Sequence, residues 1–428
     1  MRARRSERIP PPPGVLLETG PGRHVRALRA DGEVDTDRLA TAVRTVAAAP
    51  PFAGFAPDLR RHHADELGPG DPMASCVALL RAERDRPADR DGGPPIRFHW
   101  VPLAEHGHVL GLVAPRRALD ARSLYAALGA VFQAYFGRFR VAAYRDPTEL
   151  AGFDPVGRPA ADQARRRWWD KELPRYATPV RSARTAHRRT VRSERLRVDA
   201  QCWATLTGGN GPLGASGSLA VVALLAWCLR AQGRPGTGFC CDFDLRDAYE
   251  LGPVLGPFTD RLPFRVDLDG LKSPAFSEVM QRTQAGFLDS VVHYLPYPRL
   301  LDQGLRTGAL PTPHTAALWD VTVHFCRNPP RSARTKNEGS PAGGLFSIEL
   351  FREAELLGHT GHLGAAPDDG ALLDVHIGEL DDDTVLVLDH VQPDVTEAGA
   401  AQLMDLLRQL IYRVGADPAA PLPDLSQR

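Results

Sequence analysis

The sequence lacks any long apolar run and any excess of one charge. No segment reaches the ~18 consecutive apolar residues of a typical spanning helix. Arg2, Arg4 and Arg5 are followed by prolines and not by an apolar core, which argues against a secretory signal peptide. Lys plus Arg equals Asp plus Glu at 52 each, so no global field favours nucleic acid or an anionic membrane. We therefore predict a cytoplasmic protein that binds neither nucleic acid nor a membrane.

The sequence also lacks a cysteine motif. Of its six cysteines only Cys240 and Cys241 are neighbours, which makes neither a C-x-x-C pair nor a disulfide framework. His62 and His63 lie in a polar stretch that we interpret as a solvated loop, where adjacent histidines rarely point the same way. We expect reduced, mostly buried thiols, no metal site and no bound cofactor.

The length predicts two lobes. A chain of 428 residues, 43% of them hydrophobic, is too long for one ordinary core. Residues 1–14 contain a proline run and arginines, so we expect a disordered lead-in there. We place the N-terminal lobe at 15–178, a basic connector at 179–192 and the C-terminal lobe at 193–428. Charged residues of a connector normally face water, so we interpret its arginines as solvated.

Apolar periodicity predicts helices and strands in both lobes. Residues 96–103 alternate apolar and polar, and 108–114 are nearly all apolar, which indicates paired strands with the second buried on both faces. Ser123 stands where we expect the N-cap of a helix whose apolar stripe ends at Tyr135. In the second lobe we expect helices over 216–230, 275–290 and 399–414, strands over 193–198 and 237–243, and a hairpin of 371–378 with 384–390.

The residues after the buried strand are the most informative. Pro115, Arg116, Asp120 and Ala121 lead from that strand into the next helix. This segment resembles the active site of nonribosomal peptide condensation domains, where such a strand ends in His-His-x-x-x-Asp-Gly. An ungapped match places Pro115 and Arg116 at the two histidines, Asp120 at the aspartate and Ala121 at the glycine. The motif is therefore degenerate, because the usual catalytic histidine is missing.

Further segments resemble the same family, in its order along the chain. The family carries Gly-x-Phe-x-Asn-Thr-x-x-x-Arg in its second lobe, and this chain matches it at Gly256, Phe258 and Arg265, with Asp260 in place of the asparagine. The paired tryptophans that end the predicted first lobe are similar as well. The resemblance covers about residues 15–425, and an ordered set of short matches is less open to chance than any one of them.

The resemblance implies an α/β (α+β) fold of two chloramphenicol acetyltransferase-like lobes set as a V around a central tunnel. Thioesters on the 4'-phosphopantetheine arm of a carrier protein enter such a tunnel, and Gly256, Phe258 and Asp260 are expected along it. In the family the aspartate of the motif holds the loop through an ion pair, so we expect Asp120 to pair with an arginine such as Arg265. The residues expected to shape the motif are Pro115, Asp120, Ala121, Ser123 and Arg265.

Arg116 changes the chemistry that the motif can perform. In the family, the second histidine is thought to orient or deprotonate the attacking amine. A guanidinium has a pKa above ~12 and only donates hydrogen bonds, so it cannot act as that base. Arg116 could instead stabilise the thioester oxyanion or the carboxylate of the acceptor. A second hypothesis supplies the base from elsewhere, with His293 and His324 as candidates.

A third hypothesis is a silent domain that docks carrier proteins or tailoring enzymes. Condensation-like recruitment domains of glycopeptide assembly lines do so, and they resemble this chain in having arginine at the second position. We predict an amide-forming acyltransferase of nonribosomal peptide or hybrid natural-product biosynthesis, with the docking platform as the alternative. Its expected partners are a peptidyl or acyl carrier protein and an amine acceptor, small or carrier-bound. The candidate catalytic residues are Arg116, His293 and His324.

Overall fold

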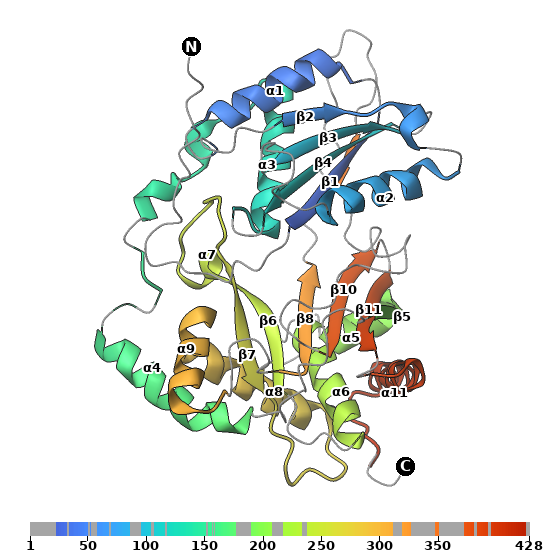
Figure 1. Cartoon of the computed structure of the whole chain (residues 1–428). Helices are drawn as coiled ribbons and strands as arrows, with labels where there is room; N and C mark the ends of the chain where they lie inside the picture. The colour runs from blue at the N-terminus through green and yellow to red at the C-terminus, as the bar shows by residue number, and fades with distance from the viewer. Residues whose placement is uncertain are drawn as a thin grey trace. The chain divides into compact units, whose positions relative to one another are not determined.

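The computed structural model divides the chain into two compact units (Figure 1). The first unit comprises Met1–Pro155, Asp244–Asp260 and Asn328–Thr360, and the second comprises Val156–Phe243, Arg261–Arg327 and Gly361–Arg428. Within these ranges the structure describes residues 23–31, 34–49, 52, 58–67, 70–85, 96–103, 107–115, 118–150, 153–155, 157, 159–176, 190–207, 217–232, 238–310, 319–326, 347–350, 372–380, 383–392 and 395–424.

This division differs from the predicted lobe boundaries. The chain leaves the first unit after Pro155, well before residue 178, and returns to it for Asp244–Asp260. A cut into two continuous pieces cannot represent that return. The lead-in at 1–14 and residues 179–189 of the predicted connector lie outside the described residues, and 190–192 belong to a strand.

The first unit contains a five-stranded sheet in the order β2-β3-β4-β1-β9. Strand β4 is central and pairs antiparallel with both β1 and β3. The strands are β1 (Arg23–Asp31), β2 (Asp58–Arg61), β3 (Arg97–Pro102), β4 (His108–Pro115) and β9 (Ser347–Leu350). The helices are α1 (Thr36–Ala48), α2 (Pro72–Asp85), α3 (Ala121–Tyr135) and the short α7 (Leu245–Ala248), with 3-10 turns at Ala64–Leu67, Val141–Ala143 and Pro147–Leu150.

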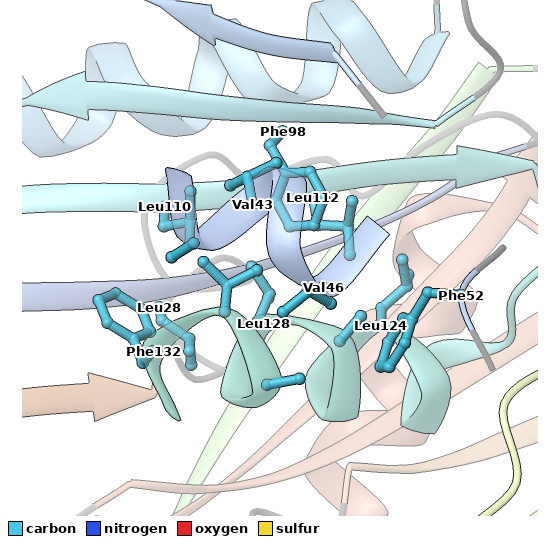
Figure 2. Packing of buried hydrophobic residues seen from close by; sticks show 14 of the residues in the cluster. Leu28, Val43, Val46, Phe52, Phe98, Leu110, Leu112, Leu124, Leu128 and Phe132 are labelled. Carbon is cyan, nitrogen blue, oxygen red and sulfur yellow. The ribbon is translucent and has the colours of Figure 1, made fainter. Parts of the chain in front are cut away.

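Strand β4 is buried on both faces, as its apolar run predicts. Leu110 and Leu112 belong to a core cluster with the apolar stripes of α1 and α3, which Figure 2 shows from close by. Val109 and Val113 belong to a second cluster with residues of α2. Between them, Gly111 lets α2 approach, because a Cβ there would lie 2.5 Å from the Cδ2 atom of Leu80. Two helix layers thus fix the strand that leads into the degenerate motif.

The second unit contains a six-stranded mixed sheet in the order β5-β11-β10-β8-β6-β7. The strands are β5 (Thr190–Asp199), β6 (Gly238–Asp244), β7 (Thr259–Arg265), β8 (Val321–Cys326), β10 (Leu373–Leu380) and β11 (Asp383–Gln392). The predicted hairpin is confirmed as β10 and β11, which pair antiparallel, whereas β8 runs parallel to β10 and β6. Asp244, the last residue of β6, and Thr259 and Asp260, the first two residues of β7, belong to the first unit.

The predicted helices of the second lobe are confirmed, and others flank them. They are α4 (Pro159–Glu172), α5 (Ala200–Thr207), α6 (Gly217–Ala231), α8 (Phe276–Val292), α9 (Tyr297–Thr307) and α11 (Glu397–Ala416), with a 3-10 turn at Leu173–Arg175. Helices α5 and α11 contact β5 and β11. On β5, Leu196 and Val198 are buried whereas Arg195 and Arg197 are exposed, so one face of this sheet is apolar and the other polar.

Two findings on the described residues concern apolar helices and cysteines. None of the described helices is both long and apolar enough to span a bilayer. Five described cysteines are buried free thiols, at positions 76, 202, 228, 240 and 241. Burial raises the pKa of the Cys76 thiol to about 12, which makes it a poor nucleophile at neutral pH.

Candidate functional site

The degenerate motif joins the end of β4 to the start of α3. The carbonyl of Pro115, the last residue of β4, accepts hydrogen bonds from the N–H groups of Ala118 at 2.9 Å and Leu119 at 3.2 Å. Arg116 lies outside the described residues, so its predicted role stays a prediction. Asp120 is the N-cap of α3, and Ala121 is the first helical residue. Both sides of the motif are therefore anchored to regular structure.

The N-cap of α3 is Asp120 and not Ser123, which corrects our expectation. The Asp120 backbone is extended, and its Oδ1 atom accepts the N–H of Ser123 at 2.9 Å. This is the usual cap geometry, in which a side-chain oxygen satisfies an N–H of the first turn. A carboxylate also suits the partial positive charge at a helix N-terminus.

The partner of Asp120 is Arg246, from the segment that returns to the first unit. The two side chains form a bidentate pair, with Nη1 to Oδ2 at 2.8 Å and Nη2 to Oδ1 at 3.1 Å. The Asp120 side chain is 4% exposed and that of Arg246 is 3% exposed. The expected pairing with Arg265 is wrong: Arg265 belongs to the second unit, where its Nη2 lies 3.3 Å from Oδ2 of Asp267.

Three further donors converge on Asp120. Its Oδ2 atom accepts the N–H of Phe258 at 2.9 Å, the N–H of Thr259 at 3.0 Å and the hydroxyl of Thr259 at 3.1 Å. Burial alone raises the pKa of this carboxyl. The charge of Arg246 and the hydrogen bonds from Arg246 and Ser123 outweigh burial and hold the pKa of Asp120 below its usual value. Asp120 is therefore an ionised structural anchor at neutral pH.

Ser123 and Gly256 connect the same network. The Ser123 hydroxyl accepts hydrogen bonds from Nη2 of Arg246 at 2.7 Å and the N–H of Gly256 at 3.0 Å, and it donates to the carbonyl of Gly256 at 3.0 Å. Nη2 of Arg246 also donates to that carbonyl at 3.0 Å, and its Nε donates to the carbonyl of Val254 at 2.7 Å. Every nitrogen of this buried guanidinium thus has a partner, as a buried charge requires.

Gly256 and Phe258 fit together closely in this network. The φ of Gly256 is 150°, and a Cβ on it would lie 2.7 Å from Cε2 of Phe258. The Phe258 ring lies 4.9 Å from the guanidinium carbon of Arg246, within cation–π range. Phe258 is 1% exposed and Asp260 is 2% exposed. All three residues expected along a tunnel are thus on the segment that supports the motif, and their contact with substrate stays a prediction.

Arg246 is the residue that sequence reasoning missed. Arg246 lies two residues after Asp244, the N-cap of the short helix α7. The Asp244 side chain accepts the N–H of Arg246 at 2.9 Å. Only this local cap could be read from the sequence. At the same end of α7, Arg122 of α3 pairs with Asp244 at 2.9 Å and with Asp247 at 2.7 Å. The arginine-rich composition of the chain hides which of its arginines is buried.

The two candidate histidines lie in the second unit. His293 is the C-cap of α8, and its ring stacks on Trp168 with the centroids 4.5 Å apart. Its Nδ1 lies 2.8 Å from the carbonyl of Asp289, which makes Nδ1 the donor and leaves Nε2 as an acceptor. The next indole, that of Trp169, donates to the carbonyl of His293 at 2.8 Å. His293 is therefore oriented by contacts within the second unit.

His324 lies on β8 beside acidic groups. Its Nδ1 is 3.0 Å from Oδ2 of Asp242 on the neighbouring strand β6. A carboxylate in this position orients an imidazole and favours one tautomer. His324 lies on β8, whereas His293 is the C-cap of α8, so the two candidates belong to different elements of the second unit. Their predicted catalytic roles stay predictions.

His62 is buried, so our interpretation of it as part of a solvated loop is wrong. Its Nδ1 lies 2.8 Å from Oε2 of Glu66, and its Nε2 lies 3.1 Å from Nδ1 of His99 on β3. The His99 side chain is inaccessible, and burial lowers its pKa to about 4. His62 is therefore part of the interior of the first unit, whereas His63 is exposed.

Solved structures resemble the whole chain. The tallysomycin biosynthesis protein TlmII shares 43% of its residues with this chain, with a TM-score of 0.77 over 94% of this chain and 95% of TlmII. The chain belongs to the condensation-domain family. No family model matches the sequence, and a search of curated proteins found no match.

More distant condensation-type structures share the fold. The first condensation domain of the calcium-dependent antibiotic synthetase has a TM-score of 0.68 at 15% identity, over 96% of this chain and 94% of that one. The X-domain from teicoplanin biosynthesis has a TM-score of 0.62 at 20% identity, over 95% and 93%. The predicted fold of two chloramphenicol acetyltransferase-like lobes is confirmed. Within this fold, Asp120 is surrounded by an intact set of hydrogen-bonding partners.

Proposed function

We propose that this condensation-domain protein acts in nonribosomal peptide or hybrid natural-product biosynthesis, as an acyltransferase that forms an amide. Its donor would be an acyl or aminoacyl thioester on the 4'-phosphopantetheine arm of a carrier protein. Its acceptor would be an amine, small or carrier-bound. The observation that carries the proposal is the buried anchor at the end of the motif: Asp120 is held by Arg246 and by three backbone or hydroxyl donors.

The proposed reaction needs no base from the motif. A neutral amine attacks the thioester carbonyl carbon, a C–N bond forms, and the carbonyl oxygen becomes an oxyanion. Arg116 would donate hydrogen bonds to that oxyanion, a contribution on the order of several kcal/mol for a preorganised charged donor. Collapse of the intermediate breaks the C–S bond and releases the pantetheine thiol, which takes up the proton that the nitrogen loses. Holding the reactants together lowers the barrier further.

The likeness to TlmII supports a role in biosynthesis, since that protein belongs to tallysomycin biosynthesis and matches along nearly the whole chain. The same family also supports a second candidate function. The teicoplanin X-domain shares this fold and has been solved in complex with OxyB. Together with arginine at the second motif position, this favours a docking platform for carrier proteins or tailoring enzymes as the alternative.

One assay separates the two functions. A carrier protein loaded with a candidate acyl group is incubated with acceptor and with wild type, Arg116→Ala or Arg117→Ala, and the carrier's intact mass is followed. Arg117 is the matched control because it is the adjacent arginine. Acyl transfer by wild type and Arg117→Ala, but not by Arg116→Ala, is the expected result. Carrier binding without transfer, equal in all three proteins, would establish the platform instead.

A further inference from the structure

The polar face of the second unit's sheet carries two histidines and an aspartate in one cluster. Asp374 and His376 are two residues apart on β10, so they share a face. The register pairs His376 with His324 on β8, and Figure 1 shows these strands side by side. The two imidazole rings stack with centroids 4.7 Å apart. Possible ligand atoms of His324, Asp374 and His376 all lie within 4.8 Å of one another.

The spacing of these side-chain atoms is close to that of ligands on one metal ion. Two oxygen or nitrogen atoms on one tetrahedral zinc ion, each at about 2.0–2.2 Å, lie about 3.3–3.6 Å apart. Nε2 of His324 lies 3.9 Å from Oδ1 of Asp374, so these two atoms are close to that spacing and need to approach only slightly. The side chains remain accessible enough for an ion to enter: that of His324 is 30% exposed and that of Asp374 is 17% exposed. The possible ligand atoms of all three side chains lie within 4.8 Å of one another, so the His376 ring must also turn toward a shared ion.

Two more carboxylates lie beside the histidines. Asp242 on β6 contacts Nδ1 of His324 at 3.0 Å, which directs Nε2 of that ring toward Asp374. Asp389 on β11 lies 3.7 Å from Nε2 of His376, and Asp389 itself accepts a hydrogen bond from the hydroxyl of Ser193. A carboxylate behind a ligating imidazole fixes its orientation and raises its basicity. The cluster thus places two imidazoles beside three carboxylates, those of Asp374, Asp242 and Asp389.

We propose that His324, Asp374 and His376 bind a divalent first-row transition ion, with zinc as the ion to test. Two imidazole nitrogens and one carboxylate oxygen are a ligand set that such ions accept. Three protein ligands leave at least one coordination position for water or another small ligand. Asp242 is a positioning residue for His324, and Asp389 is one for His376.

The metal site goes beyond the proposed acyl transfer, which uses the motif of the first unit and needs no metal. It bears on one hypothesis for the missing base. An imidazole nitrogen that donates its lone pair to a metal cannot also accept a proton, so an occupied site removes His324 as a candidate base. Zinc binding is measured without substrate, so failure of either proposal leaves the other standing.

The test is zinc binding by the full-length, chelator-treated protein, measured by calorimetry and by elemental analysis after desalting. We expect one zinc ion per chain. Asp242→Asn should weaken binding by about 10-fold to 100-fold, the usual effect of losing an outer carboxylate. Asp374→Asn and His376→Gln remove ligands and should weaken it more. His63→Ala removes an exposed imidazole of the first unit and should leave affinity unchanged.

Folding and ligation are separated by a second measurement. The unfolding temperature of each metal-free variant is compared with that of wild type, and zinc should raise the temperature of wild type and His63→Ala but not of Asp374→Asn. Cobalt substitution gives a visible spectrum that reports nitrogen and oxygen ligands independently. Absence of zinc binding by wild type would overturn the proposal and leave the cluster as ion pairs between protonated histidine and aspartate. Equal binding by Asp374→Asn, His376→Gln and His63→Ala would also overturn it, because the binding would then be adventitious.

Discussion

Asp120 and Arg246 lie 126 residues apart in the chain, and their side chains meet at 2.8 Å inside the first unit. Asp120 begins the helix that follows the degenerate motif, and Arg246 belongs to a segment that the chain reaches only after it has entered the second unit. The pair therefore links a distant segment to the residue that begins α3.

Loss of Arg246 should destabilise the protein strongly. Arg246→Met leaves the Asp120 carboxylate buried without its charge partner, which typically costs about 3–5 kcal/mol in the free energy of unfolding. The control is Arg122→Ala, because the side chain of Arg122 is 53% exposed and its ion pairs face water. That change should cost at most about 1 kcal/mol. Urea unfolding followed by circular dichroism measures both, and equal costs would contradict the anchoring role of Arg246.

Gly256→Ala should also destabilise the motif. The φ of 150° is strained for alanine, and the new Cβ would lie 2.7 Å from the Phe258 ring. We expect a cost of about 1–3 kcal/mol for the unfavourable backbone. Gly129→Ala is the matched control, since Gly129 lies within α3 and a Cβ there meets no atom within 4 Å. That control should stabilise by roughly 0.5–1 kcal/mol. A neutral Gly256→Ala would show that the loop can relax.

The burial of His99 predicts loss of stability in mild acid. The pKa of His99 in the folded protein is about 4, below the ordinary value of 6.5. Between pH 4 and 6.5 the unfolded chain therefore binds a proton on His99 that the folded chain does not. Stability is therefore fully present above pH 6.5 and falls as the pH drops toward 4, by up to about 3 kcal/mol for a shift of this size. His99→Gln should unfold with a flatter pH dependence than wild type in urea titrations from pH 7.5 to 4.5. Parallel curves would assign the acid sensitivity to other groups.

The pH dependence of acyl transfer should distinguish the sources of the base. With Arg116 as an oxyanion donor and no protein base, the amine must lose its own proton, and a free α-amino group has an ordinary pKa near ~8. We therefore expect the rate of transfer to keep rising from pH 7 to 8.5. A rate that levels off above neutral pH in wild type, but not in His293→Ala or His324→Ala, would assign the base to that histidine. Single-turnover measurements on the loaded carrier protein give the rate.

Local patterns were sufficient to predict much of the fold. The apolar run at 108–114 predicts a strand buried on both faces, and β4 has helices packed on each side. Helical periodicity predicts α6, α8 and α11, and the alternation around residue 381 predicts the hairpin of β10 with β11. These features depend on which faces of one element are apolar. The sequence carries that information within a few turns.

The site depended more on distant contacts, and there the sequence was less informative. The family motif identified Asp120 as a loop anchor, but its expected partner Arg265 pairs with Asp267, and Arg246 takes its place. Both arginines lie among polar and apolar neighbours of similar kind, so composition cannot tell them apart. His62 was expected in water and is buried against His99. The partner of Asp120 lies 126 residues away in the sequence, and only the path of the folded chain brings it near.

The sequence by itself thus determined the family, the mixed α/β elements and the absence of a histidine at the motif, because each is written in consecutive residues. The tertiary structure decided which arginine neutralises Asp120, where the chain crosses between its two units, and that His324 lies beside Asp374 and His376. The physical reason is the same in each case. Burial removes water as a partner, and only the folded chain brings together the charges that must then satisfy one another.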